Sequence, residues 1–224
     1  MTAEKNSLES SNMNDHNSNI TRTEVAWAIS KIKLHSAPGP DRVLPIMVKY
    51  AGAQLHNALH VTFQKCWHEG DFSEEWRKEN GIYLKKPGKE DYNNSKSYRG
   101  ISLSSVLGKA LERIANMRLV NFLKNHDLYD KYQYAYQRNK SLTQAMLFFT
   151  LSVLKGFKNG EKTVAIFVDL EGAFDNLWRQ GLLYLLHTAG LRERLLIFIA
   201  TYVSNRTVRN IVNNHMSEWV DRKS

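Results

Sequence analysis

The sequence is poor in cysteine and in long apolar runs. Its one cysteine, Cys66, excludes an intramolecular disulfide and leaves a structural zinc site without its usual thiolate ligands. No apolar stretch approaches the roughly 20 residues needed to span a bilayer, and the N-terminus lacks the apolar region of a signal peptide. These absences predict an intracellular protein that does not enter a membrane, and they do not distinguish nucleus from cytoplasm.

Acidic residues are also comparatively few. The 224 residues include 31 Lys and Arg against 22 Asp and Glu, which gives a formal net charge of +9. This charge favours nucleic acid or an anionic membrane surface as a partner, although it is also common in proteins that bind neither. With 42% hydrophobic residues, the chain is long enough for one sizeable core or two small ones.

The N-terminal part of the chain has clear local signals. Residues 1–20 are rich in Ser and Asn and contain few large apolar side chains, which predicts a disordered leader. Thr21 and Glu24 form a capping-box pattern, which predicts a helix that ends near Ser36. Two prolines and a glycine in residues 36–41 then force a rigid turn, and a helical region follows over about residues 45–69.

The spacing of apolar residues predicts the remaining elements. A short strand over residues 79–86 ends in the basic loop Pro87-Gly88-Lys89. The pattern also predicts core-packing helices marked by residues 107–122 and 142–153, helices over residues 182–186 and 191–202, and a closing pair of short strands over residues 207–212 and 217–220.

Residues 163–170 carry apolar side chains on both alternating faces, as a central strand covered on both sides requires. Asp169 interrupts this run. A carboxylate at the carboxyl end of a buried strand is held where it can ligate Mg²⁺ together with phosphate oxygens of a substrate. An aspartate in this context also caps the following turn or helix, and for a lone aspartate that role is the more frequent one.

Several blocks in the sequence together resemble the reverse transcriptases of non-LTR retrotransposons, especially those of jockey-like mobile elements. Residues 168–175, Val-Asp-Leu-Glu-Gly-Ala-Phe-Asp, resemble motif A of that family. Residues 98–103, Tyr-Arg-Gly-Ile-Ser-Leu, are similar to its Y-R-P-I-S-L block. Each block alone is a weak motif, but five in the family's order are strong evidence. The other three are residues 36–41, 86–89 and 133–136, which resemble its A-P-G-P-D, K-P-G-K and Q-x-G-F segments.

The resemblance implies an α+β, right-hand polymerase fold. It places a fingers region over residues 21–160 and a partial palm with motif A over residues 161–224, and no thumb. The family's P-Q-G block and its Y-x-D-D turn, which carries the other catalytic aspartates, do not occur in the sequence. One carboxylate does not hold two Mg²⁺ ions against their hydration. The resemblance therefore implies a truncated RNA-directed DNA polymerase that is inactive alone, so whether the chain is itself an enzyme stays open.

Two further hypotheses remain. A non-catalytic remnant of such a domain would use its basic fingers to bind RNA or other nucleic acid electrostatically. A shortened palm would expose an unpaired sheet edge, which predicts a fragment of low stability. Gly100 stands where the family has proline, and Ala135-Tyr136 stand where it usually has Gly-Phe, so the resemblance implies looser fingers.

In the family that the sequence resembles, the motif A aspartate binds two catalytic Mg²⁺ ions, and Asp169 matches it. The main-chain carbonyl of Leu170 would complete one ion's shell, and the amides of Gly172 and Ala173 would meet phosphate oxygens of the incoming dNTP. Phe174 matches the aromatic residue that excludes a 2′-hydroxyl. Core packing is the alternative role of this ring.

The resemblance also implies contacts with the incoming dNTP, the RNA template and the DNA primer. Arg99 matches a fingers arginine that clasps the triphosphate, and Lys85 or Lys86 would assist it. Residues 77–113 hold nine Lys and Arg against four Asp and Glu, which suits a track for template phosphates, although a solvated basic face is the alternative. The predicted nucleic-acid contacts are Lys89, Lys109, Arg113 and Arg138.

Two other patterns carry less weight. His56 and His60 have the spacing of two zinc ligands on a helix, but Asn57 replaces the glutamate of a metal hydrolase, so we interpret them as helix-surface histidines. Glu171 and Asp175 flank the motif A core without an obligatory metal role, and Asp175 is better suited to start the next helix. The oligomeric state is not predicted.

Overall fold

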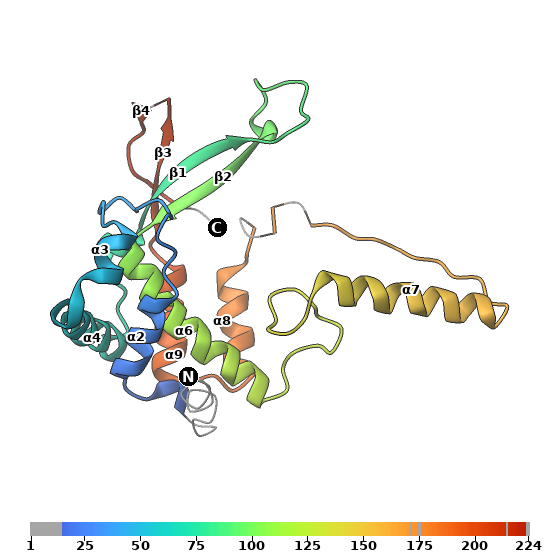
Figure 1. The fold of residues 1–224 in the computed structure, drawn as a ribbon, viewed down its shortest axis with the longest axis horizontal. Helices are drawn as coiled ribbons and strands as arrows, with labels where there is room; N and C mark the ends of the chain where they lie inside the picture. The colour runs from blue at the N-terminus through green and yellow to red at the C-terminus, as the bar shows by residue number, and fades with distance from the viewer. Residues whose placement is uncertain (1–14, 171, 174–175, 214, 223–224) are drawn as a thin grey trace. The chain divides into compact units, whose positions relative to one another are not determined.

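The computed structural model describes residues 15–170, 172–173, 176–213 and 215–222 (Figure 1). The chain forms two compact units. The larger one comprises residues up to Phe122 together with those from Trp178 onward, and the smaller one is Leu123–Leu177. Helices and a mixed sheet make up the larger unit, so the chain is of mixed α and β type. The predicted division between fingers and palm at residues 160 and 161 stays a prediction.

The helices of the larger unit follow the sequence pattern closely. Helix α2 (Arg22–Ser30) starts at the predicted capping box, in which the Glu24 amide donates to Thr21 Oγ1 at 3.1 Å and the Thr21 amide donates to Glu24 Oε2 at 2.8 Å. The helix ends earlier than predicted, at Ser30. The other helices here are α3 (Pro45–Tyr50), α4 (Gly52–Glu69), α5 (Glu74–Arg77), α6 (Val106–Asn125), α8 (Arg179–Thr188) and α9 (Glu193–Val203).

The sheet joins segments that lie far apart in the sequence. Strands β1 (Lys78–Lys85) and β2 (Tyr98–Ser104) form an antiparallel hairpin, and β1 pairs in parallel with β3 (Thr207–Val212). Strands β4 (His215–Met216) and β5 (Val220–Asp221) both pair antiparallel with β3. The prediction of one strand over residues 217–220 is therefore wrong in its bounds. The strand character of residues 98–104 was not predicted, because their apolar content is low.

An aromatic cluster forms the core of the larger unit. Phe72 makes edge contacts with the rings of Trp76 and Phe198 at centroid distances of 5.8 Å each, and Trp67 contacts Phe198 at 5.5 Å. Leu111 of α6 is fully buried. The prediction that α6 packs into a core is confirmed.

Residues just before α2 are part of this unit and not of a disordered leader. Residues 15–17 form a short 3-10 helix, and Ile20 is buried. The Ile20 amide donates to Gln64 Oε1 at 2.7 Å, and Arg118 donates to the Ser18 carbonyl at 2.6 Å. The predicted leader is thus wrong for residues 15–20, whose main chain is held by side chains of α4 and α6. Residues 1–14 lie outside the described part.

The smaller unit contains helix α7 (Leu142–Lys158) and an extended segment, residues 161–170, that returns along it (Figure 1). Phe149 of α7 contacts Phe167 of the segment at 5.8 Å. Two predictions fail here. Residues 163–170 do not form a strand and Ile166 is 84% exposed, while α7 leaves Leu142 78% exposed. The strand pattern requires cover on both faces and the helix pattern requires it on one, but most apolar side chains of both segments are exposed.

No helix in the described ranges is long and apolar enough to cross a membrane.

Candidate nucleotide and nucleic-acid interface

The β1–β2 hairpin carries the basic residues predicted to meet phosphates. Its register places Leu84 opposite Arg99 and Lys85 opposite Tyr98. Because side chains alternate along a strand, Arg99 shares one face with Leu84, and Lys85 projects from the other face with Tyr98. Arg99 and Lys85 are both exposed. The two cations therefore do not converge on one point of a single face.

Contacts within the hairpin loop occupy both of the lysines predicted to assist Arg99. Lys86 donates through its amide to the Ser97 carbonyl at 2.8 Å and through Nζ to the Lys96 carbonyl at 2.9 Å. The ammonium of Lys85 lies 4.9 Å from the centre of the Tyr92 ring, a cation–π geometry. These contacts give both lysines a role in holding the loop closed.

Lys89 has a different setting. It follows Gly88, whose φ of +75° belongs to the left-handed region that favours glycine, and its side chain is exposed in the turn. Lys89 and Arg99 are thus the two predicted cations of the hairpin whose side chains are exposed and make no hydrogen bond, ion pair or ring contact within the described part of the chain.

On α6, the two other predicted cations are half-buried. Arg113 donates through Nη1 to the Ala28 carbonyl at 3.0 Å, near the carboxyl end of α2. Burial lowers the pKa of this guanidinium below its usual value. Arg113 therefore satisfies a helix-end carbonyl, and only the remaining donors of its side chain are available to a phosphate. Lys109 lies one turn before it.

Motif A residues lie in the smaller unit. Asp169 and Leu170 end the extended segment, and both are exposed. Gly172 has φ +65°, and the Asn176 amide donates to its carbonyl at 2.9 Å. A Cβ at Gly172 would lie 2.9 Å from Asn176 Nδ2, the end of a flexible side chain, so the positive φ is what favours glycine. The chain thus turns at Gly172 and Ala173, and the approach of their amides to phosphate stays a prediction. Ala173 is exposed in this turn.

Phe174, the predicted sugar-sensing residue, and the flanking Glu171 and Asp175 lie outside the described residues.

The residues predicted to hold metal ions fit Mg²⁺ in kind. A carboxylate and a main-chain carbonyl are the oxygen ligands that this ion prefers. Among the described residues, no group of three or more His, Cys, Asp or Glu could hold a metal ion. The incomplete metal site predicted around Asp169 stays a prediction.

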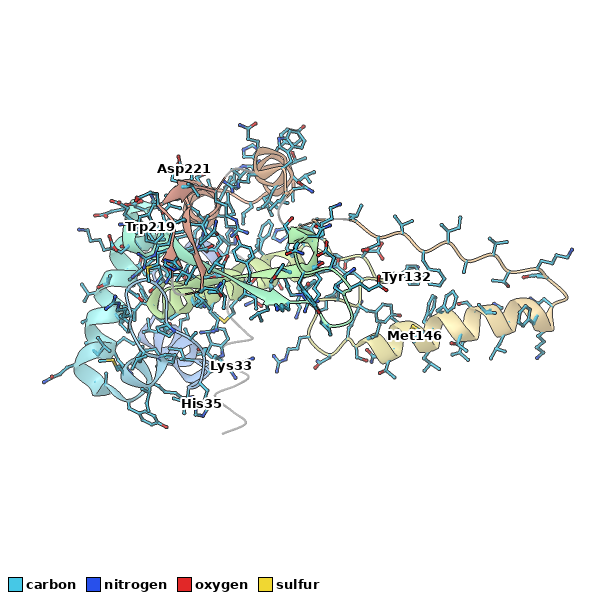
Figure 2. The ribbon with its side chains drawn as sticks, turned by 90° about the horizontal axis from the view of Figure 1, so that it is seen from above. Lys33, His35, Tyr132, Met146, Trp219 and Asp221 are labelled. Carbon is cyan, nitrogen blue, oxygen red and sulfur yellow. The ribbon has the colours of Figure 1, made fainter. Side chains whose placement is uncertain are left out.

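The loop that leads into α7 contains aromatic residues that the sequence reasoning missed. Lys131 lies 4.8 Å from the ring centre of Tyr132, and Tyr132 in turn packs against Phe148 of α7 at 5.2 Å. Figure 2 labels Tyr132 in this loop and Met146 on the neighbouring helix. Tyr136 is 86% exposed, and the predicted contact Arg138 is exposed beside it. The available signal was the tyrosine density of residues 129–136, where four tyrosines stand beside one cation, Lys131, and one amide, Gln133.

The predicted site residues divide between the two units. The larger unit brings Lys85, Lys86, Lys89 and Arg99 together on one hairpin, with Lys109 and Arg113 on the helix that follows it. The smaller unit holds Arg138, Asp169, Leu170, Gly172 and Ala173.

His56 and His60 do not form a ligand pair in the described structure. The Nε2 atom of His60 is hydrogen-bonded to the Ile20 carbonyl at 2.8 Å, which places this ring in the contact between α4 and the segment before α2. The interpretation as helix-surface histidines is wrong in one respect, because both residues are half-buried and His56 Nε2 is buried without a hydrogen-bond partner in the described structure.

Comparison with known proteins decides the family. A family model described as reverse transcriptase (RNA-dependent DNA polymerase) matches residues 84–221, which include Arg99 and Asp169. This match covers more than half of the chain. The chain belongs to the reverse transcriptase family.

Relatives place this reverse transcriptase domain among those of non-LTR retrotransposons. It is 30% identical over 168 residues to a probable RNA-directed DNA polymerase from transposon BS of Drosophila melanogaster, which covers 71% of the chain and 18% of that protein. It is 27% identical over 198 residues to the RNA-directed DNA polymerase from the mobile element jockey of the same species, covering 88% of the chain and 21% of the relative. The chain thus spans about a fifth of the relatives' length.

A related protein of the type-1 retrotransposable element R1 from Bradysia coprophila is 29% identical over 163 residues, 72% of the chain and 16% of the relative. Members of the reverse transcriptase family use divalent metal ions and act on a nucleic-acid template and primer. The fold and the family thus agree on a reverse transcriptase domain, in which the basic hairpin and the motif A turn are the candidate functional elements.

Proposed function

We propose that this reverse transcriptase domain binds an RNA template and DNA primer through its basic β1–β2 hairpin, and that motif A supplies one carboxylate to the metal ions of DNA synthesis. The exposed hairpin carries this proposal, because it presents Arg99 and Lys89 to solvent within a segment of net charge +5, residues 77–113. Lysine and arginine contacts with phosphates dominate the affinity of proteins for nucleic acids.

Within the hairpin the cations have distinct roles. Lys85 and Lys86 stabilise the loop, whereas Lys89 contacts the nucleic-acid backbone. Arg99 is suited to the triphosphate of an incoming dNTP, because a planar guanidinium binds two phosphate oxygens at once. Its position on the opposite face from Lys85 means that it acts without the assistance of that lysine.

Motif A would receive the metal-bound triphosphate. Mg²⁺ bound there would neutralise charge on the phosphates and activate the primer hydroxyl. Asp169 and the Leu170 carbonyl supply oxygen ligands, and the turn at Gly172 and Ala173 exposes main-chain amides for phosphate oxygens. Phe174 is proposed to exclude the 2′-hydroxyl of a ribonucleotide.

Nucleic-acid binding without synthesis is the activity that we propose for a polypeptide of this sequence alone. This follows the second hypothesis drawn from the sequence, because Asp169 alone would not hold two Mg²⁺ ions against their hydration.

Primer extension on an RNA template with Mg²⁺ and dNTPs tests this proposal, with an Asp169→Ala variant measured in parallel. Gel retention of the same labelled template–primer is recorded in the same samples. We expect both proteins to retain the template–primer and neither to extend it. Extension by the wild type that is lost in Asp169→Ala would show a complete metal site and contradict the binding-only activity. Absence of retention would contradict the proposed function altogether.

A further inference from the structure

Strand β2 runs directly into helix α6. The strand ends at Ser104 and the helix begins at Val106, so Ser105 is the only residue between them. Ser105 is fully buried, and its Oγ accepts hydrogen bonds from the amides of Leu107 at 3.2 Å and Gly108 at 3.3 Å. It thus caps the first turn of α6. With a single connecting residue, the angle between the hairpin and α6 depends on the local geometry at Ser105.

A second segment fixes this junction from outside. Asp41, in the turn formed by residues 36–41, accepts a hydrogen bond through Oδ2 from Ser105 Oγ at 2.6 Å. Its other oxygen, Oδ1, accepts from the Val43 amide at 3.2 Å, which holds the carboxylate in place. The Ser105 hydroxyl has one proton, and because its oxygen already accepts from α6, that proton is available for Asp41. Asp41 therefore holds the junction through a directional hydrogen bond from Ser105.

Close packing of Gly39 adds a contact that does not depend on charge. A Cβ at Gly39 would lie 2.5 Å from the Ser105 nitrogen and 2.6 Å from the Ser104 carbonyl carbon. Both atoms belong to the main chain, which moves little, so only glycine fits here. The Arg42 amide donates to the Gly39 carbonyl at 3.1 Å, which closes the turn. The rigid turn predicted from two prolines and a glycine is thus seated on the junction.

We propose that Asp41 is a positioning residue that acts through Ser105 to fix the hairpin, and with it Arg99 and Lys89, relative to α6. The consequence for RNA rests on the proposed function, whereas the fixing of the angle rests only on the contacts at Ser105. Neither Asp41 nor Gly39 touches the nucleic acid in this proposal. They set where the cations of the hairpin stand relative to Lys109.

Electron-spin distance measurement on the full chain tests the fixing of the angle. Spin labels are attached at Glu90→Cys in the exposed hairpin loop and at Asn116→Cys on the exposed side of α6, in a Cys66→Ala background that leaves no other thiol. We expect a narrow distance distribution with wild-type residues at positions 39 and 41, and a broadened or shifted one in Asp41→Ala and in Gly39→Ala. Asp41→Asn should keep the narrow distribution, because its amide oxygen still accepts from Ser105.

Fluorescence anisotropy with a labelled single-stranded RNA measures the consequence for binding, on the same variants without labels. We expect Asp41→Ala to weaken binding by about fivefold, and Asp41→Asn to restore it. Glu69→Ala is the matched control, because it removes an exposed carboxylate of α4 that pairs with Lys65, outside residues 77–113. It should change neither the distance distribution nor the affinity. Melting temperatures record stability separately.

Each outcome decides something. If folded Asp41→Ala has the same distance distribution as the wild type, the proposal is overturned. It is also overturned if the distribution in Asp41→Asn is as broad as the distribution in Asp41→Ala. If Asp41→Ala does not fold, Gly39→Ala is the deciding variant. A wild-type distance distribution in Gly39→Ala would then overturn the proposal. A broadened distribution with unchanged RNA affinity contradicts the positioning role. If the wild type binds no RNA, the proposed function fails. The distance measurements still test whether Asp41 and Gly39 fix the angle between the hairpin and α6.

Discussion

At the scale of single residues, a buried ion pair connects the first helix to the longest one. Arg118 of α6 donates through Nε and Nη2 to the two carboxylate oxygens of Glu24, both at 2.8 Å. The two side chains are 6% and 8% exposed. A paired charge removed from water is costly to leave without its partner. The pair therefore holds α2, the segment before it and α6 together.

Glu24→Gln tests this pair. The amide keeps the shape of the carboxylate but leaves the Arg118 charge buried and uncompensated, so the free energy of unfolding should fall by about 3–5 kcal/mol. Urea unfolding followed by circular dichroism measures it. Asp71→Asn, which alters the ion pair of Arg77 with a 63%-exposed aspartate, should cost less than about 1 kcal/mol. Equal losses in the two variants would contradict the assigned burial.

The thiol of Cys66 gives a pH-dependent prediction. Burial raises the pKa of this thiol above its ordinary value of 9.0, because the charged thiolate is poorly solvated there. The folded chain thus holds the proton to higher pH than the unfolded chain does. The stabilising contribution is complete below about pH 9 and is lost as the pH rises towards the folded-state value. Cys66→Ala should therefore lose less unfolding free energy than the wild type between pH 8 and 10 in urea titrations. Parallel losses would count against this assignment.

At the scale of secondary-structure elements, α6 and residues 163–170 show where sequence patterns suffice and where they do not. Both have the apolar content of a core element. The 3.6-residue spacing of α6 meets a core in the larger unit, and Leu111 is buried. Residues 163–170 have an equally clear pattern, but burial needs other segments to cover them, and a local pattern does not report whether these are present.

Two substitutions distinguish the exposed residues 163–170 from the buried face of α6. Ile166→Lys should change the free energy of unfolding by less than about 0.5 kcal/mol, because the side chain is 84% exposed. Leu111→Ala should lower it by about 2–5 kcal/mol, because it leaves a cavity at a fully buried position. Thermal or chemical unfolding measures both. A large loss in Ile166→Lys would show that residues 163–170 are buried after all.

The β1–β2 hairpin likewise shows how much of the candidate site can be predicted from sequence. Its cations and the K-P-G-K loop are readable in the sequence, and so is the order of the family's blocks. The position of Lys85 and Arg99 on opposite faces was not predictable, because the face of each side chain depends on strand register. The same holds for Asp41, whose partner Ser105 is 64 residues away. Sequence spacing identified the turn, and only the fold shows what the turn holds.

At the scale of the whole molecule, charge and ancestry lead to one account. The chain belongs to the reverse transcriptase family, spans about a fifth of its relatives' length, and carries a net charge of +9. More than half of that excess lies in residues 77–113, where nine Lys and Arg stand against four Asp and Glu. The proposed function therefore depends most on whether this segment meets phosphates.

The salt dependence of RNA binding tests that claim most directly. Fluorescence anisotropy measures the affinity for a labelled single-stranded RNA over a series of salt concentrations, for the wild type and for the double variant Lys89→Ala, Arg99→Ala. The account predicts a steep fall in affinity with salt, and a logarithmic slope that is shallower in the double variant by about 0.7 for each phosphate contact removed. Lys65→Ala, at an exposed lysine of α4, should leave the slope unchanged. An unchanged slope in the double variant, or affinity that does not respond to salt, would contradict the central claim.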